Sequence, residues 1–240
     1  MNKETLLLEL KKIGLLINEN TFAKISDFCN FLILENKKTN LTAIKELEEI
    51  YLKHVYDSLT LSQGIDLNRV ESLLDIGSGA GFPGIVIKIV FPQIKVTLLD
   101  SNNKKTTFLH NAIKRLGLET ITVVTSRAEE YILKNRETYD LVTARAVSEL
   151  RIIAELAIPY VKVGGIFIAM KGKKNNEEMR SGVTTAEILN SNLSGTQEFL
   201  LPVEKSERTL YIFNKLKPTP KEYPRSYDRI VKNSLKKEPK

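Results

Sequence analysis

The sequence predicts a doubly wound α/β fold with a helical extension in front of it, and two observations lead to this prediction. Apolar residues recur every three or four positions before Val70, whereas short β-rich runs alternate with helical stretches after it. A glycine-rich turn also follows the first of these β-rich runs. Alternation of strand and helix is typical of right-handed βαβ units that build a parallel sheet.

Residues 1–69 are expected to form a helical extension that packs on the core. Apolar side chains at helical spacing give a helix one apolar face, which is buried against another element. Two sets have this spacing: Leu6, Leu7, Leu10 and Ile13, then Phe22, Ile25, Phe28, Cys29 and Leu32.

Residues 70–216 are expected to form the core domain. After the fifth strand the alternation changes, because a helical stretch over 177–189 is followed by extended runs over 198–203 and 209–215, close enough for a hairpin. The whole order predicts a mostly parallel seven-stranded sheet with an antiparallel last strand. The first five strands are expected at 72–76, 95–99, 121–125, 140–144 and 166–170, with helices at 83–90, 104–117, 128–135 and 148–160.

The composition is that of a globular protein in a reducing compartment. Apolar residues make up 42% of the 240 positions, which is enough to bury a substantial core. Cys29 is the one cysteine, so neither a disulfide nor a thiolate metal site is expected. The N-terminus lacks the pattern of a secretory signal, and no apolar run is long enough to span a membrane. We expect a cytoplasmic protein without a bound metal.

Residues 217–240 are expected to form a basic C-terminal tail. The net charge is +7, and from Lys215 onward nine basic residues face three acidic ones. A basic tail attracts polyanions by counterion release, which favours nucleic acid as a partner. A solubilising terminus explains the same charge equally well, so the charge alone leaves both open.

A buried strand over 73–76 runs into the glycine-rich turn Gly77–Gly84, and this segment predicts a nucleotide site. Glycine lets the backbone approach a ligand closely, and the helix that follows presents free N–H groups. The next strand ends at Asp100, 23 residues after Gly77, where a carboxylate can meet both hydroxyls of a ribose. A tight turn and a capping aspartate alone would give part of this pattern, but the combination is more specific.

The register of the glycine turn favours S-adenosylmethionine over NAD. Counted from Gly77 the pattern is G-x-G-x-G, with Phe82 where the dinucleotide motif has its third glycine. A match to G-x-G-x-x-G starts at Gly79, but it lies later relative to the strand. Asp75 is expected to orient the loop and to face the aminopropyl end of the cofactor. Glu129 could accept a hydrogen bond from the adenine amino group, although helix dipoles also favour acids there.

Several motifs occur in order along nearly the whole chain. They are Asn40-Leu41-Thr42, His54-Val55-Tyr56-Asp57-Ser58, the loop Asp75–Gly84, Asp100-Ser101, Arg127-Ala128-Glu129, Thr143-Ala144-Arg145-Ala146, Lys171-Gly172 and Tyr223-Pro224-Arg225. Together they resemble the ribosomal RNA small subunit methyltransferase G family of guanine-N7 methyltransferases, also called glucose-inhibited division protein B. An ordered set of motifs is much more specific than any one of them.

The resemblance implies a Rossmann-like class I S-adenosylmethionine-dependent methyltransferase in the bacterial cytoplasm, and we expect a monomer. Its substrate would be a guanine N7 in 16S ribosomal RNA or in the small ribosomal subunit, near the decoding centre. The chain departs from the family over 226–230, where many relatives have a basic run with glycine and proline, so the RNA contacts of the tail are open. The resemblance and the glycine turn together give these cofactor-binding residues: Gly77, Gly79, Phe82, Asp100, Ala128, Glu129 and Arg145.

No catalytic acid or base stands out, and the expected reaction needs none. Methyl transfer from a sulfonium is an in-line displacement, so the enzyme mainly has to align the reacting atoms. Guanine N7 has a lone pair and no proton to lose. Amino-directed enzymes usually carry an Asn/Asp-Pro-Pro-aromatic tetrad where this chain has residues 144–147. Pyrimidine C5 chemistry needs a cysteine near the site, whereas Cys29 lies in the extension.

The roles of several basic side chains stay open. His54 could be a general acid, an RNA contact or a structural residue, and the last two are favoured because N7 gives it no proton to take. Six cations are expected near the cleft, where they could hold phosphates, although each alone is an ordinary surface charge. They are Lys104, Lys105, Lys171, Lys173, Lys174 and Arg208.

Three other functions remain open at the level of sequence. The chain could methylate a different RNA, a protein or a small molecule. It could be an NAD-dependent oxidoreductase, which the match from Gly79 permits, although the sequence shows no second catalytic domain. It could also be an RNA-binding factor without catalysis, because a fold does not carry a function by itself.

Overall fold

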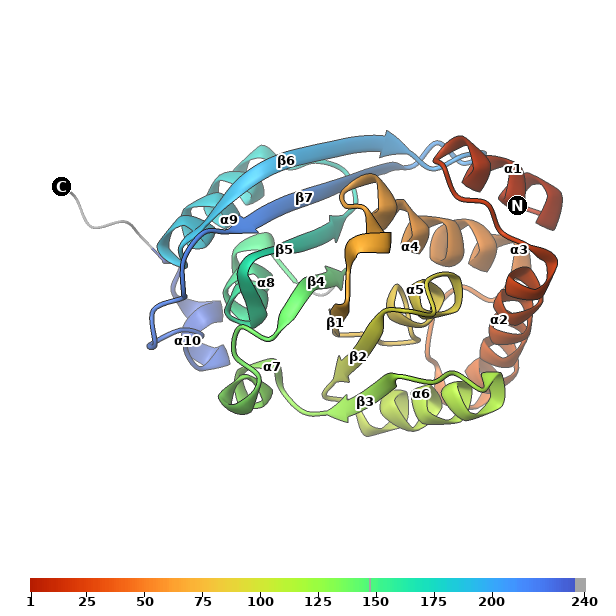
Figure 1. Cartoon of the computed structure of the whole chain (residues 1–240), viewed down its shortest axis with the longest axis horizontal. Helices are drawn as coiled ribbons and strands as arrows, with labels where there is room; N and C mark the ends of the chain where they lie inside the picture. The colour runs from red at the N-terminus through yellow and green to blue at the C-terminus, as the bar shows by residue number, and fades with distance from the viewer. Residues whose placement is uncertain (147, 236–240) are drawn as a thin grey trace.

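The computed structural model describes residues 1–146 and 148–235 of the chain. A seven-stranded sheet runs through the middle, with helices on both faces (Figure 1). The strands are arranged in the order β3-β2-β1-β4-β5-β7-β6. Their bounds are β1 (Ser72–Ile76), β2 (Lys95–Asp100), β3 (Ile121–Thr125), β4 (Tyr139–Arg145), β5 (Val161–Lys171), β6 (Ser191–Leu200) and β7 (Glu207–Lys215).

Neighbouring strands are parallel except at β7, which runs antiparallel to both β5 and β6. This confirms the predicted mostly parallel sheet with an antiparallel last strand. The order reverses at β1, because β2 lies on one side of it and β4 on the other. Such a reversal leaves a crevice at the carboxyl ends of the strands, where open α/β sheets bind ligands.

The sixth strand begins earlier than the sequence predicts. The prediction is 198–203, whereas β6 covers Ser191–Leu200. The first half of β6 is polar and contains Gly195, a composition that strands usually avoid. The fold tolerates it because β6 is at the edge of the sheet and pairs only with β7, with an irregularity between Leu193 and Gly195.

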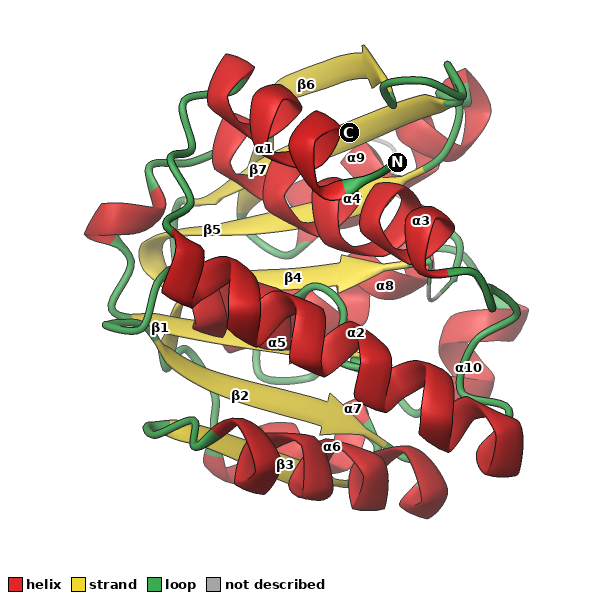
Figure 2. Cartoon of the chain, turned by 90° about the vertical axis from the view of Figure 1, so that its right-hand side faces the viewer, coloured by secondary structure: helices red, strands yellow, loops and turns green. Residues whose placement is uncertain are grey.

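The helices divide between the two faces of the sheet. Figure 2 views the face covered by the N-terminal helices together with α5 and α6, and α7 to α10 lie behind the sheet. Each face has its own cluster of buried apolar side chains, as a doubly wound sheet requires. The bounds are α1 (Lys3–Lys12), α2 (Glu19–Thr39), α3 (Leu47–Ile50), η1 (Tyr51–Tyr56), α4 (Asp57–Leu59), η2 (Thr60–Gln63), η3 (Leu67–Arg69), α5 (Gly84–Val90), α6 (Asn103–Leu116), α7 (Ala128–Tyr131), η4 (Ile132–Lys134), α8 (Leu150–Ala157), η5 (Ile158–Tyr160), α9 (Asn176–Ile188) and α10 (Tyr227–Lys232).

The N-terminal helices share their buried cluster with the sheet domain. The side chain of Asn18 starts α2 by accepting a hydrogen bond from Thr21 N at 2.8 Å. Phe28 on α2 is fully buried, and its ring centroid lies 5.2 Å from that of Phe82 in the glycine loop and 6.3 Å from that of Phe108 on α6. The extension therefore packs directly against the loop that follows β1.

The C-terminal segment folds onto the core as far as it is described. Residues 217–235 turn back beside α8 and contain the short helix α10 (Figure 1). Residues 236–240, with Lys236, Lys237 and Lys240 of the predicted basic tail, lie outside the described residues. The predicted division of the chain after residues 69 and 216 stays a prediction. In the part of the chain that the structure describes, no helix has the length and apolar character needed to cross a membrane.

Phe28→Ala is expected to lower the free energy of unfolding by about 3–5 kcal/mol, because truncation leaves a cavity between the extension and the sheet domain. Urea unfolding followed by circular dichroism measures this. Leu34→Ala on the same helix is the matched control, since Leu34 is 52% exposed. Its truncation should change the stability by less than about 0.5 kcal/mol. Equal stability of the two variants would contradict the packing described above.

Candidate functional site

The glycine loop between β1 and α5 is shaped by positive backbone angles and one buried carboxylate. Gly77 and Gly79 have φ angles of 70° and 56°, which glycine adopts at little cost. Asp75 Oδ2 accepts a hydrogen bond from Gly84 N at 3.0 Å, where α5 begins. A Cβ on Gly84 would lie 2.2 Å from Leu98 Cδ2, so α5 approaches β2 this closely only because a glycine is there.

Asp75 holds the loop from a fully buried position. Its side chain is fully buried, and burial raises its pKa to about 7. Its Oδ1 atom has no hydrogen-bond partner among the described residues. The prediction that Asp75 orients the loop is confirmed by its bond to Gly84. The prediction that it faces the aminopropyl end of a cofactor stays a prediction, although Asp75 lies outside the lining of the cavity next to the loop.

A cavity of about 410 Å³, here called the first cavity, opens at the carboxyl ends of β1, β2, β3 and β4. Its volume is in the usual range for small-molecule sites. The fold brings all of the sequence-predicted cofactor residues to this cavity, although the contact of each with a cofactor stays a prediction. The residues concerned are Gly77, Gly79, Phe82, Asp100, Ala128, Glu129 and Arg145.

Asp100, at the end of β2, links the glycine loop to the first cavity. Its Oδ2 atom accepts a hydrogen bond from Gly79 N at 2.9 Å, and its Oδ1 atom accepts one from Asn102 N at 2.9 Å. Each carboxylate oxygen can accept a further hydrogen bond. Asp100 can therefore hold the loop and still accept hydrogen bonds from two adjacent hydroxyls, as a ribose requires.

The segment after β3 forms another wall of the first cavity. Ala128 is buried, and Tyr160 fixes its position by donating a hydrogen bond to the Ala128 carbonyl oxygen. Glu129 is half-buried and lines the cavity. Tyr227 lines it too, although it lies far along the chain, in a segment that no longer matches the family pattern and carries no motif.

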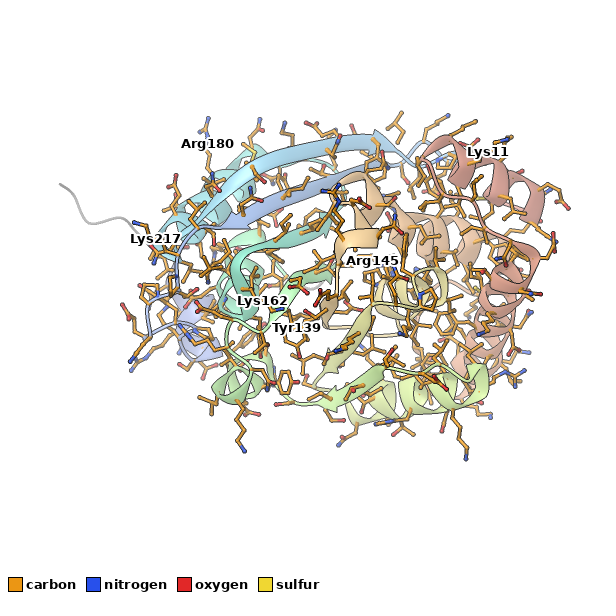
Figure 3. The ribbon with its side chains drawn as sticks, in the orientation of Figure 1. Lys11, Tyr139, Arg145, Lys162, Arg180 and Lys217 are labelled. Carbon is orange, nitrogen blue, oxygen red and sulfur yellow. The ribbon has the colours of Figure 1, made fainter. Side chains whose placement is uncertain are left out.

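Arg145 extends from the end of β4 towards the N-terminal extension (Figure 3). Its NH1 group donates to the Lys53 carbonyl oxygen at 2.9 Å and to Asp57 Oδ2 at 3.0 Å. The other oxygen of Asp57 accepts a hydrogen bond from Arg208 Nε at 3.1 Å. Asp57 is only 5% exposed, so one buried carboxylate is shared by guanidinium groups from β4 and β7.

His54 is held as a neutral ring beside Arg145. His54 Nδ1 lies 3.1 Å from Arg145 NH2, which can only donate a hydrogen bond, and 3.1 Å from the Lys53 carbonyl oxygen, which can only accept one. His54 Nε2 shares a hydrogen bond of 2.9 Å with Thr42 Oγ1. Burial and, next, the charge of Arg145 lower the pKa of His54 to about 3. The ring also stacks on Phe82, with centroids 4.6 Å apart, which fixes His54 in the cavity wall.

A second cavity of about 440 Å³ adjoins the first. Both are lined by His54, Arg145 and Ala146, so the wall that they share lies at the end of β4. The remaining walls of the second cavity combine apolar side chains with cations, among them Met170, Phe199, Leu210, Lys171 and Arg208.

Most of the basic residues predicted near the cleft are tied to carboxylates. Lys105 lines the first cavity, 4.0 Å from Asp100, and Lys104 is exposed on α6. The role of these residues in holding phosphates stays a prediction. The other pairs are Lys171–Glu178 at 2.6 Å, Lys173–Glu207 at 3.4 Å, Lys174–Glu198 at 2.6 Å and Arg208–Asp57 at 3.1 Å.

The same fold recurs in solved structures. The chain is similar to M. jannaschii TYW2 in complex with AdoMet, with a TM-score of 0.52 and 13% identity over 67% of this chain and 77% of that one. It is also similar to the cyclase SpnF, with a TM-score of 0.52 and 12% identity over 67% of this chain and 81% of that one. Identities this low show the fold alone. The strand order, the glycine loop and Asp100 together give the Rossmann-like fold of class I S-adenosylmethionine-dependent methyltransferases.

Sequence comparison gives the family. The family model for rRNA small subunit methyltransferase G matches residues 21–208. The ribosomal RNA small subunit methyltransferase G of Lysinibacillus sphaericus is 44% identical over 227 residues, which cover 94% of this chain and 95% of the relative. The protein of the same name from an Exiguobacterium species is 40% identical over 237 residues, 98% of this chain and 100% of the relative. The chain belongs to the rRNA small subunit methyltransferase G family, as its motifs predicted.

Asp100→Asn is expected to weaken S-adenosylhomocysteine binding by about 10- to 100-fold. Asparagine has one acceptor oxygen, so it cannot accept from both Gly79 N and Asn102 N, and a hydrogen bond to a charged group contributes about 1.5–3 kcal/mol. Isothermal titration calorimetry measures the affinity. Asp66→Asn, on an exposed turn outside the first cavity, is the control and should bind like the wild type. Unchanged affinity in a folded Asp100→Asn protein would contradict the role of this carboxylate.

The ring protons of His54 are expected to keep constant NMR shifts between about pH 5 and 8, where an ordinary histidine titrates. Its folded pKa of about 3 lies below the ordinary 6.5, so the stability it contributes is complete above pH 6.5 and is lost as the pH falls towards 3. Comparison with His54→Gln assigns the resonance. A titration midpoint near 6.5 would mean that the ring is accessible to solvent and not held as described.

Proposed function

We propose that this chain methylates N7 of one guanine in 16S ribosomal RNA, free or in the small ribosomal subunit, as a cytoplasmic monomer. The observation that supports this best is the pair of adjoining cavities that share Arg145 and His54. The first suits a nucleotide cofactor, and the second is large enough for a base. The similar proteins from Lysinibacillus and Exiguobacterium are named as methyltransferases of small subunit ribosomal RNA.

The first cavity fits S-adenosylmethionine through backbone and carboxylate groups. Gly77 and Gly79 allow a close approach of the loop backbone, and Asp100 has lone pairs for the ribose hydroxyls. Glu129 can accept a hydrogen bond from the adenine amino group. Bound S-adenosylmethionine supplies a methyl group that its positively charged sulfur activates. The protein has to keep this methyl group directed at the wall that the two cavities share.

The second cavity suits the guanine base. A base that is modified leaves its stack and enters a protein pocket. Phe199 and Leu210 can cover the faces of the base. Arg208 NH2 has no hydrogen-bond partner in the described part of the chain, so it can donate to guanine O6. Because O6 and N7 lie on the same edge of guanine, this bond would turn N7 towards Arg145 and the first cavity.

The reaction then needs alignment and no proton transfer. The N7 lone pair forms the new nitrogen–carbon bond while the carbon–sulfur bond breaks, and the positive charge passes from sulfur to the base. His54 uses both ring nitrogens in hydrogen bonds, and Asp57 is shared by two arginines. Neither is free to act as a base, which suits an acceptor without a proton to lose. Alignment can lower the barrier by about 7–11 kcal/mol in favourable cases.

The charge of the chain supports a polyanionic substrate. The net charge is +7. In the C-terminal segment Lys217, Lys221, Arg229 and Lys232 are exposed, so these cations are available to phosphates. Binding that depends on such contacts weakens as salt is raised, which distinguishes an RNA substrate from a small molecule.

Labelled S-adenosylmethionine is expected to methylate 16S RNA, or small subunits, from cells that lack this modification. One guanine should carry the label, and borohydride reduction followed by aniline cleavage should place the methyl group on N7. Arg145→Lys should lower kcat/KM by about 100-fold, because lysine cannot hold Asp57 and His54 together and a small misplacement costs that much. Arg115→Lys, in an exposed ion pair with Asp27, is the control and should react like the wild type.

Two results would count against this function. Cofactor binding without methyl transfer to either RNA substrate would exclude 16S ribosomal RNA as the methyl acceptor. Transfer to a ring carbon or an exocyclic amine would keep the RNA substrate but exclude N7, and with it the argument that no base is needed.

A further inference from the structure

Residues 217–235, here called the C-terminal strap, are anchored on the core by an arginine from the loop before β4. Arg136 donates from NH1 to the Tyr223 carbonyl oxygen at 2.7 Å. Its NH2 group donates to the carbonyl oxygens of Thr219 at 2.9 Å and Pro220 at 2.7 Å. One guanidinium thus donates hydrogen bonds to three backbone carbonyls, and these bonds fix the path of the first part of the strap.

A second anchor is the ion pair between Arg225 and Glu155 on α8. Glu155 is 1% exposed and accepts hydrogen bonds from Arg225 N at 3.0 Å, Nε at 2.8 Å and NH2 at 2.7 Å. A buried carboxylate is costly when unpaired, so this bidentate pair resists opening. Ile230 on α10 is buried as well, and Arg151 NH1 donates to its carbonyl oxygen at 2.7 Å.

Between these anchors the strap carries Tyr227 to the first cavity. Tyr227 begins α10 and lines the cavity together with Ala128 and Glu129. The Arg127 guanidinium lies 5.7 Å from the centroid of its ring. The residue is 36% exposed, whereas Ile230 on the same helix is 1% exposed and packs into the core. The ring of Tyr227 is therefore partly exposed at the cavity, while Ile230 anchors the helix to the core.

We infer that Tyr227 stacks on the adenine ring of S-adenosylmethionine and that the strap closes this half of the first cavity. The inference rests on the proposed function, because it assigns that cavity to this cofactor. Ala128 and Glu129 form the wall that is expected to contact adenine. Asp100, at the end of β2, is expected to bind the ribose. Adenine has a flat π-face, and Tyr227 offers the complementary aromatic surface in this wall.

A fluorescence titration tests the contact directly. The chain contains no tryptophan, so Tyr227→Trp introduces a single reporter at this position. S-adenosylhomocysteine and adenosine are expected to quench its emission saturably through stacking, whereas methionine, which has no base, should leave it unchanged. Val231→Trp is the matched control, because Val231 lies on the same helix, is 42% exposed and does not line the cavity. Its emission should not respond to any of the three ligands.

Calorimetry with S-adenosylhomocysteine tests the contribution to affinity. Tyr227→Phe keeps the ring and should bind like the wild type, whereas Tyr227→Ala should bind about tenfold more weakly. Arg225→Gln should also weaken binding, because the strap loses its ion pair with Glu155. Val231→Ala should bind like the wild type.

The outcomes separate this inference from the proposed function. Equal quenching in both reporters, or unchanged affinity in Tyr227→Ala, overturns the contact, while the cofactor binding seen in the same experiment leaves the proposed function standing. A wild-type protein that binds neither S-adenosylhomocysteine nor S-adenosylmethionine overturns both.

Discussion

The site depends on one buried carboxylate that two arginines share. Asp57 comes from the N-terminal extension, Arg145 from β4 and Arg208 from β7. Loss of either arginine would leave a buried charge with half of its partners, which is costly in a low-dielectric interior. The extension, the centre of the sheet and the antiparallel strand are thus tied together at the point where the two cavities meet. The site geometry is a property of the whole chain.

Arg145 also helps to fix the position of the two cavities relative to each other. Its guanidinium lines both of them and contacts His54. The His54 ring in turn stacks on Phe82 in the glycine loop. A neutral histidine serves this purpose well, because a charged ring would repel the neighbouring guanidinium. The same contacts that position the two halves of the site leave no side chain in this network free to accept a proton, in keeping with a reaction governed by alignment.

Local sequence patterns determined the fold class and the cofactor side of the site. Strand and helix periodicity predicted the sheet, and glycines at the end of β1 with Asp100 at the end of β2 predicted the first cavity, because parallel strands place their carboxyl ends at one edge. The start of β6 escaped prediction, since an edge strand that contains Gly195 and polar residues lacks the alternation of a buried one.

Only the tertiary structure decided which charges are free and which residues complete the cavities. Arg208 is an ordinary surface cation in the sequence, yet it is bound to Asp57 from the other end of the chain. Asp75 precedes the glycines as a ligand residue would, yet it is buried and turned towards Gly84. Tyr227 reaches the first cavity only because the strap folds back over α8. Ion pairs and cavity walls join residues that are distant in sequence, so no local pattern encodes them.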